Sequence, residues 1–285
     1  MADRSIRPND RADMQLHTIH SDGQWQPDEL IRYLAGHGFA VAAITDHDTL
    51  EHTDEIRALG AAAGMQIVPA TEITATWRGL PVHLLCYAAA FSTDDLRMLA
   101  AGIRERQLAN TRDVHAELLR QGYAFPLATD VLAHQNGMVV RPIDNARLLL
   151  THEYARDLDD ALAMIREAGY RQVSAPLDEA IAAAHASGAI TVLGHPGRGG
   201  GELHRFDLTE LAHLVAELPL DGIEVYYPAH TPEQVAGFAS FARDHRLLVS
   251  AGSDSHGPLR QYPVAYPASQ IQPFLERCGI LVVQD

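Results

Sequence analysis

Short apolar stretches alternate with amphipathic stretches along most of the chain. The apolar runs are the length of buried strands, and they lie at residues 40–45, 65–72, 81–87, 189–193, 222–227, 247–252 and 280–283. The intervening stretches repeat apolar residues every three or four positions, as helices do, at residues 27–36, 51–63, 177–188, 208–218 and 233–245. Strands that alternate with helices predict an α/β fold with a parallel sheet, either open or closed into a barrel.

This alternation stops between Phe91 and Val173. Two amphipathic stretches lie in the interval, a long one, D-D-L-R-M-L-A-A-G-I-R-E-R-Q-L-A-N-T-R-D-V-H-A-E-L-L-R-Q-G, and a shorter one, D-L-D-D-A-L-A-M-I-R-E-A-G. Their period is helical. We therefore expect residues 10–90 and 174–285 to form one domain, and residues 91–173 to form a mostly helical insertion.

The stretch D-M-Q-L-H-T-I-H-S-D-G, from Asp13 to Gly23, follows a short alternating run. Side chains two apart on a strand point the same way, so Gln15 and His17 share a face. Nitrogen and oxygen ligands at a strand end, with Asp22 just beyond, are typical of a metal site. Taken alone, the stretch fits equally well a polar strand end with surface histidines.

Histidines and carboxylates recur at or just beyond the ends of the other predicted strands. These side chains are His17, Asp22, His47, Glu72, His83, His195, Asp254 and His256. In a parallel barrel the carboxyl ends of the strands converge on one face, where barrel enzymes place their active sites. Histidine and carboxylate without thiolate suit zinc, manganese or iron. The pattern therefore predicts a cluster of divalent metal ions.

Charge and composition narrow the range of partners. The chain has 285 residues, of which 47% are hydrophobic and 21% charged, and its formal net charge is −15. Such a chain repels phosphates over most of its surface, so we expect no general nucleic-acid binding surface. A nucleotide substrate stays possible because bound divalent ions reverse the sign of the charge locally.

Several sequence signals are missing. Cys86 and Cys278 form no C-x-x-C pair and no disulfide framework, which favours a reducing cytoplasm. The amino-terminal residues lack a signal-peptide core, and no apolar run approaches the roughly 18 residues of a membrane span. Neither G-x-x-x-x-G-K-[ST] nor G-x-G-x-x-G occurs, so an open nucleotide-binding sheet has no support.

The strand-end motifs together resemble those of the polymerase and histidinol phosphatase (PHP) family of metal-dependent phosphoesterases. The resemblance runs from Asp13 to about Gly257. Its motifs are H-T-x-x-S-D-G, I-T-D-H-D, A-T-E-I-T, G-H-P-G-R, I-E-V-Y-Y-P and G-S-D-S-H-G. With the helical insertion, this set is most similar to the bacterial subgroup that acts on nucleotides, nucleoside 3′,5′-bisphosphates and RNA 5′ ends.

The resemblance implies a distorted (β/α)7 TIM-like barrel that holds two or three ions of manganese, zinc or iron. The first ion would be held by His17, Glu72 and Asp254, with Gln15 where the family usually has a second histidine. Glu72 would also bridge to a second ion, held by His83 and His195. Asp22, His47 and His256 would hold a third. A hydroxide that bridges two ions is the nucleophile implied for the family.

The resemblance also implies roles in substrate binding. Arg198, three residues after His195, would bind the substrate phosphate and act in catalysis together with Asp254 and His256. Arg141 resembles an arginine of the insertion that binds substrate phosphate. Arg147 fits equally well a charge on a helix surface.

Other polar residues near the motifs leave alternatives open. His20 stands where the family places no ligand. Asp46 and Asp48 flank His47, and either one could orient a ligand histidine or cap a loop. Tyr226 and Tyr227 follow a strand and fit stacking on a base less well than packing at the barrel rim.

The function expected from this sequence is metal-dependent hydrolysis of a phosphate ester, on a nucleotide, a 3′,5′-bisphosphate or an RNA end. One alternative is a phosphatase for a small phosphomonoester such as histidinol phosphate. The other is a relative that binds metal or nucleotide without turnover, and Gln15 favours this reading because an amide oxygen is a weaker ligand than imidazole. An insertion that caps the barrel would set the size of the substrate.

Overall fold

The computed structural model describes residues 5–199 and 203–283. The chain divides into two compact units. One unit extends to Ala101 and resumes at Ser174, and the other is Gly102–Val173.

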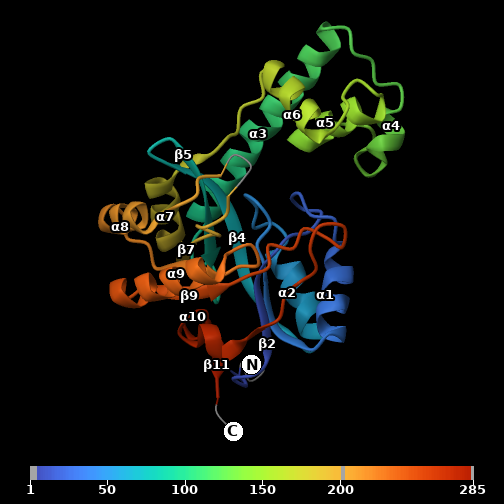
Figure 1. The fold of residues 1–285 in the computed structure, drawn as a ribbon. Coiled ribbons are helices and arrows are strands. Elements are labelled where there is room, and N and C mark those ends of the chain that lie inside the picture. The colour runs from blue at the N-terminus through green and yellow to red at the C-terminus, as the bar shows by residue number, and fades with distance from the viewer. Residues whose placement is uncertain (1–4, 200–202, 284–285) are drawn as a thin grey trace. The chain divides into compact units, whose positions relative to one another are not determined.

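The first unit is built on a sheet that nearly closes into a barrel (Figure 1). Neighbouring strands follow the order β10-β2-β3-β4-β5-β7-β8-β9, and β6 pairs separately with β4. A bridge from Leu16 to Ser255 links β2 to the segment after β9. The strands are β2 Arg11–Leu16, β3 Phe39–Ile44, β4 Gln66–Trp77, β5 Leu80–Tyr87, β6 Ala175–Pro176, β7 Ile190–Leu193, β8 Gly222–Tyr226, β9 Leu248–Ala251 and β10 Tyr266–Pro267.

The expectation of a wholly parallel sheet is wrong at β5. This strand runs antiparallel to both of its neighbours, β4 and β7. Arg78 and Gly79 join β4 to β5, and both have positive φ, 51° and 78°. Two left-handed residues between antiparallel strands are typical of a tight hairpin. The short strand β10 is also antiparallel, to β2.

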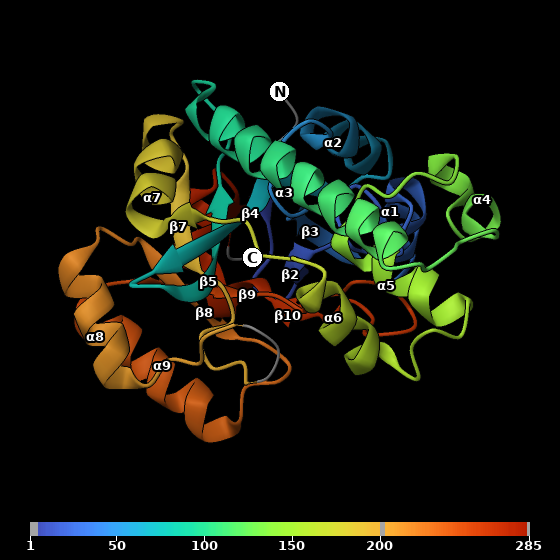
Figure 2. The same ribbon diagram turned by 90° about the horizontal axis from the view of Figure 1, so that it is seen from above.

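Helices surround this sheet on the outside (Figure 2). They are α1 Pro27–Gly36, α2 Thr53–Ala62, α7 Leu177–Ala186, α8 Leu208–Glu217 and α9 Pro232–His245. Pro27 at the start of α1, with two acidic residues in its first turn, is a favourable helix start. The segments η2 Ala268–Ile271 and α10 Gln272–Arg277 follow β10. The strands β1 Ser5–Ile6 and β11 Leu281–Val282 form a separate parallel pair.

Buried apolar residues fill the described part of the first unit. One cluster joins strand residues such as Met14 and Leu85 to Phe274 of α10. The buried Tyr87 ring packs edge-on against Phe274, and its hydroxyl donates to the carbonyl of Met14 at 2.8 Å. A second cluster lies among β2, β3, α1 and α2. This packing leaves the polar strand-end residues to occupy the opposite part of the sheet.

The second unit is helical. The helix α3 Asp95–Arg120 begins in the first unit and continues into the second. It is followed by α4 Ala128–Val131, η1 Ala133–Gln135, α5 Pro142–Thr151 and α6 Leu158–Glu167. Buried apolar residues such as Leu118, Leu149 and Ile165 form a core of its own.

Cys86 and Cys278 are free and buried. Within the described ranges, no helix combines the length and the apolar character that a bilayer crossing requires.

Candidate metal centre

Glu72 is the central carboxylate of the site. It lies within β4 rather than at its end, because β4 continues to Trp77. His83 likewise lies inside β5, so the expectation of strand-end positions is wrong for both residues. Thr74 pairs with His83 across the hairpin, which puts His83 and Glu72 on one face. The hairpin register thus brings together two residues that the sequence placed at separate strand ends.

The first ligand group consists of His17, Glu72 and Asp254. His17 follows the last residue of β2, and its Nε2 lies 3.0 Å from Glu72 Oε2 and 3.1 Å from Asp254 Oδ1. Gln15 is fully buried beside this group, and its Nε2 donates to Glu72 Oε2 at 3.0 Å. The predicted first set is therefore assembled, with the amide nitrogen of Gln15 directed at the shared carboxylate.

The second ligand group lies on the other oxygen of Glu72. His83 Nδ1 lies 2.5 Å from Glu72 Oε1, and His195 Nε2 lies 3.1 Å from the same oxygen. The rings of His83 and His195 approach to 3.3 Å between Nδ1 and Nε2. His47 also brings a nitrogen to within 4.8 Å of the ligand atoms of Glu72 and His83. Glu72 is thus placed to serve two groups at once.

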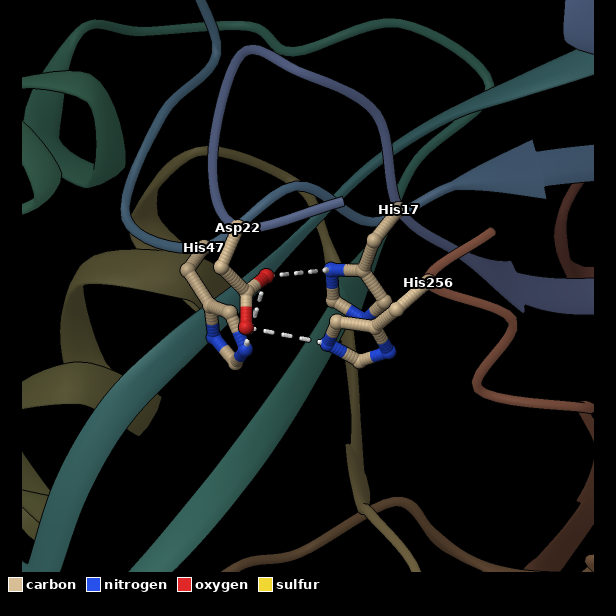
Figure 3. Close-up of side chains that lie close together, drawn as sticks. All are labelled: His17, Asp22, His47 and His256. Carbon is tan, nitrogen blue, oxygen red and sulfur yellow. Dashed lines mark ion pairs between the residues drawn. The ribbon is translucent and has the colours of Figure 1, made fainter. Parts of the chain in front are cut away.

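The third ligand group consists of Asp22, His47 and His256, together with His17 (Figure 3). His256 Nε2 lies 3.1 Å from Asp22 Oδ2, and His47 Nε2 lies 3.9 Å from Asp22 Oδ1. The ring of His17 stacks on that of His256, with 4.2 Å between centroids. Asp22 is 42% exposed, whereas Glu72 is fully buried.

Burial and opposite charge act against each other on these groups. Burial favours the neutral carboxyl of Glu72, but His83, His47, His17 and His195 hold its pKa well below the usual value. Burial likewise opposes the charge of His17, yet Asp254 and Glu72 raise its pKa well above the usual value. For His47, burial dominates and lowers the pKa to about 4. The centre therefore combines ionised carboxylates with a histidine kept neutral, the forms in which both bind metal ions.

The residues present fit divalent metal ions. Gln15 Oε1 and His47 Nδ1 are buried and have no hydrogen-bond partner within residues 5–199 and 203–283. Buried polar atoms are normally satisfied, so such atoms beside three ligand groups point to a bound species. Nitrogen and carboxylate oxygen ligands suit Zn²⁺, Mn²⁺ or Fe²⁺.

Two further carboxylates support the ligand loops, although the motifs predicted no role for them. Glu224 is buried in β8, and its Oε2 accepts from the backbone N–H of His195 at 2.8 Å. Asp13 is buried in β2 and accepts from the N–H groups of Ser253 and Val264 at 2.9 and 3.0 Å. A single carboxylate inside an apolar strand run is the signal that marks both, because such a charge is costly to bury without a purpose.

Glu224 and Asp13 hold backbone segments that contain residues in strained conformations. His195 and Asp254 both have positive φ, 30° and 55°, which is unusual for residues other than glycine. Gly252 allows the close approach of β9 to β2, because a Cβ there would lie 2.4 Å from Gln15 Cβ and 2.6 Å from Glu224 Oε1. The ligand geometry thus depends on a close approach of Gly252 to the side chains of Gln15 and Glu224, which no larger residue at position 252 permits.

Asp46 and Asp48 hold loops. Asp46 accepts from the backbone N–H and the hydroxyl of Thr18 at 2.7 and 2.6 Å, and from Ser21 Oγ. Asp48 accepts from the backbone N–H and hydroxyl of Thr74. Their partners favour the loop-capping reading over the orientation of a ligand histidine.

The predicted substrate residues lie in different units. Arg198 Nη1 donates to Asp254 Oδ2 at 2.9 Å, so this arginine lies at the first ligand group. Arg141 belongs to the second unit, at the start of α5, where it pairs with Asp144 at 3.2 Å. Tyr226 packs against the apolar core, and Tyr227 lies beside His195, with 5.5 Å between ring centroids.

No model of a known protein family matches the chain. The 5′-3′ exoribonuclease Rnm of Salmonella typhimurium is 29% identical over 252 residues, covering 86% of this chain and 85% of that protein. The 3′,5′-nucleoside bisphosphate phosphatase of Chromobacterium violaceum is 28% identical over 268 residues, covering 86% and 87%.

Among solved structures, a Bifidobacterium adolescentis protein described as a metal-dependent phosphoesterase matches with a TM-score of 0.78. It is 26% identical in sequence, and the match covers 95% of this chain and 98% of that one. By sequence and by fold, this chain is therefore similar to metal-dependent phosphoesterases and to enzymes named for action on RNA and nucleoside bisphosphates, in agreement with the resemblance that its motifs carry.

Proposed function

We propose that the chain is a metal-dependent phosphoesterase whose substrate is a nucleotide, a nucleoside 3′,5′-bisphosphate or an RNA end. The observation that carries this proposal is the sharing of ligands. Glu72 and His17 each belong to two of the three ligand groups, and His47 also belongs to two. Groups that share side chains would hold their ions close enough to contact one phosphate. The nearly closed sheet would be a variant of the distorted (β/α)7 barrel.

The proposed ions are two or three of Mn²⁺, Zn²⁺ or Fe²⁺. When bound, they would neutralise phosphate oxygens and lower the pKa of water, so that hydroxide is available as the nucleophile near neutral pH. The protein supplies the geometry: β2 positions His17, the hairpin of β4 and β5 positions Glu72 and His83, and Glu224 holds the backbone of His195.

Arg198 is proposed to bind the substrate phosphate. Its side chain is 37% exposed and pairs with Asp254. Two oxygens of a phosphate are negatively charged and accept a pair of hydrogen bonds from a guanidinium, as the two oxygens of a carboxylate do. Arg198 would therefore exchange its bond to Asp254 for one to the phosphate when substrate binds. Arg141 of the second unit is proposed as a further phosphate ligand, and Arg147→Ala on the same helix is the matched control for Arg141→Ala.

Metal removal tests the proposal. We expect chelation to abolish phosphate release, and Mn²⁺, Zn²⁺ or Fe²⁺ to restore it, with nucleotides, bisphosphates and short 5′-phosphorylated RNA as substrates. Metal content is measured on the same samples, so loss of activity can be matched to loss of ions. Activity that persists after complete metal removal would contradict the proposal.

A second candidate is a relative that binds metal without turnover. Gln15 favours it, because its amide nitrogen approaches the carboxylate that should face the first ion. Protein that binds Mn²⁺ yet releases no phosphate from any of these substrates or from small phosphomonoesters would support this candidate.

A further inference from the structure

The loop that carries His17 and Asp22 also carries His20, which belongs to a different cluster. His20 lies with His52 and Glu55 in a group whose ligand atoms are all within 4.8 Å of one another. His52 is the residue before α2, and Glu55 lies in the first turn of that helix. Neither His52 nor Glu55 takes part in the three ligand groups at Glu72 and Asp22.

The two imidazole rings of this cluster are stacked. Their centroids lie 3.4 Å apart, and their planes differ by 7°. His52 Nδ1 lies 3.6 Å from Glu55 Oε2, and the side chains of His52 and Glu55 are 33% and 65% exposed. The two imidazoles and the carboxylate thus lie close enough together for their ligand atoms to reach a single ion.

We propose that His20, His52 and Glu55 form a peripheral site for a divalent transition-metal ion such as Zn²⁺, separate from the Glu72-centred ions. Two imidazoles and one carboxylate are the ligand set of many three-residue zinc sites, which leave a further position for water. Imidazole selects Zn²⁺ and similar metals over Mg²⁺ and Ca²⁺, which prefer oxygen ligands.

Binding requires one ring to leave the stack. Two parallel imidazoles cannot both direct in-plane lone pairs at a single ion, so His20 or His52 would turn about χ2. This torsion has broad, shallow minima, and His52 is partly exposed, so the rotation costs little. The positive end of α2 disfavours a cation. Asp54 and Glu55 in the first turn offset it.

An ion at this site would tie the loop after β2 to the start of α2. His20 lies two residues before Asp22, the exposed carboxylate of the third ligand group. The peripheral ion would therefore restrict the loop that delivers Asp22, whether or not the chain is a phosphoesterase.

The test is the number of zinc ions bound by the full-length protein. We expect wild type saturated with Zn²⁺ to hold one ion more than His52→Ala, by elemental analysis after removal of free metal. Glu55→Gln should weaken that ion by at least about tenfold, the lower end of what loss of a group supporting a metal ligand costs. His37→Ala, which removes a histidine stacked on Tyr33 of α1, is the matched control and should bind as wild type does.

Equal zinc content in wild type and His52→Ala would overturn the proposal. Glu55 is exposed, so Glu55→Gln is expected to fold even if His52→Ala does not. A zinc titration of Glu55→Gln that matches wild type would also overturn the proposal. Anomalous diffraction from zinc-soaked crystals locates the ion directly, and peaks confined to the Glu72-centred groups would also overturn it.

Discussion

The ligands around Glu72 and those around Asp22 are held in different ways. Glu72 and His83 lie inside two paired strands, and Glu72 is fully buried. Asp22 lies on a loop and is 42% exposed, and its partners His47 and His256 also follow strand ends. Strand ligands are fixed by hydrogen-bonded register, whereas loop ligands depend on a few side-chain contacts such as those of Asp46. We therefore expect the ion held by Glu72, His83 and His195 to be tightly bound and the ion at Asp22 to exchange readily.

The largest effect is expected from Glu72→Gln. Two groups lose their shared carboxylate, so we expect metal affinity there to fall by more than about 100-fold and phosphate release to be lost. Elemental analysis and a phosphate-release assay measure both. Glu29→Gln, an exposed position in α1, controls for the substitution itself. If Glu72→Gln retained all of its ions, Glu72 would not be the shared ligand that holds the ions of the strand region.

Asp22→Asn is expected to act on one ion alone. The third group loses its carboxylate, so that ion should dissociate about 10- to 100-fold more readily while the ions at Glu72 remain. Metal content measured after chelation with increasing chelator concentrations distinguishes the ion at Asp22 from the ions at Glu72. If the ions at Glu72 leave together with the third, the two sets of ligands are one cooperative unit and the comparison fails.

A smaller effect is expected from Gln15→His. Imidazole is a better ligand than an amide, and its introduction removes the Gln15 amide that donates to Glu72 Oε2. We expect the ion of the first group to bind roughly tenfold more tightly. Metal titration of the two proteins measures this. Wild-type protein that already holds three fully occupied ions would show that Gln15 does not weaken the group.

The last prediction concerns the effect of pH on stability through Glu224, and it changes none of the proposed metal ligands. Burial raises the pKa of Glu224 well above its usual 4.5, despite the N–H of His195. Its contribution to stability is present below pH 4.5 and is lost as the pH rises, because the unfolded state releases the proton first. Glu224→Gln should therefore flatten the decline in unfolding free energy of metal-free protein between about pH 5 and 8, by up to about 1.4 kcal/mol per pH unit. Urea unfolding across this range measures it, and parallel curves for both proteins would contradict the assignment.

The sequence predicted most of the strands and the helical character of residues 91–173, and it singled out polar residues that the structure brings close together around Glu72. These residues could be singled out because histidines and carboxylates recur after the apolar runs of this chain. It failed on the direction of β5, because Arg78 and Gly79 form a tight hairpin without the Asn-Gly or Asp-Gly pair that marks such turns. Asp13 and Glu224 escaped notice because their roles depend on backbone N–H groups distant in sequence, which no local pattern records.

The close contact at Gly252 has a consequence for how this centre can change through evolution. Position 15 holds an amide where the resemblance implies imidazole, and the fold accommodates that amide fully buried. Position 252 has no such freedom, because any Cβ there would overlap Gln15 Cβ and Glu224 Oε1. Substitutions at residue 15 can therefore change the affinity of the first ligand group for its ion, but only while glycine is retained at position 252. In a saturation library of both positions, we expect viable sequences to vary at the first and to be nearly invariant at the second.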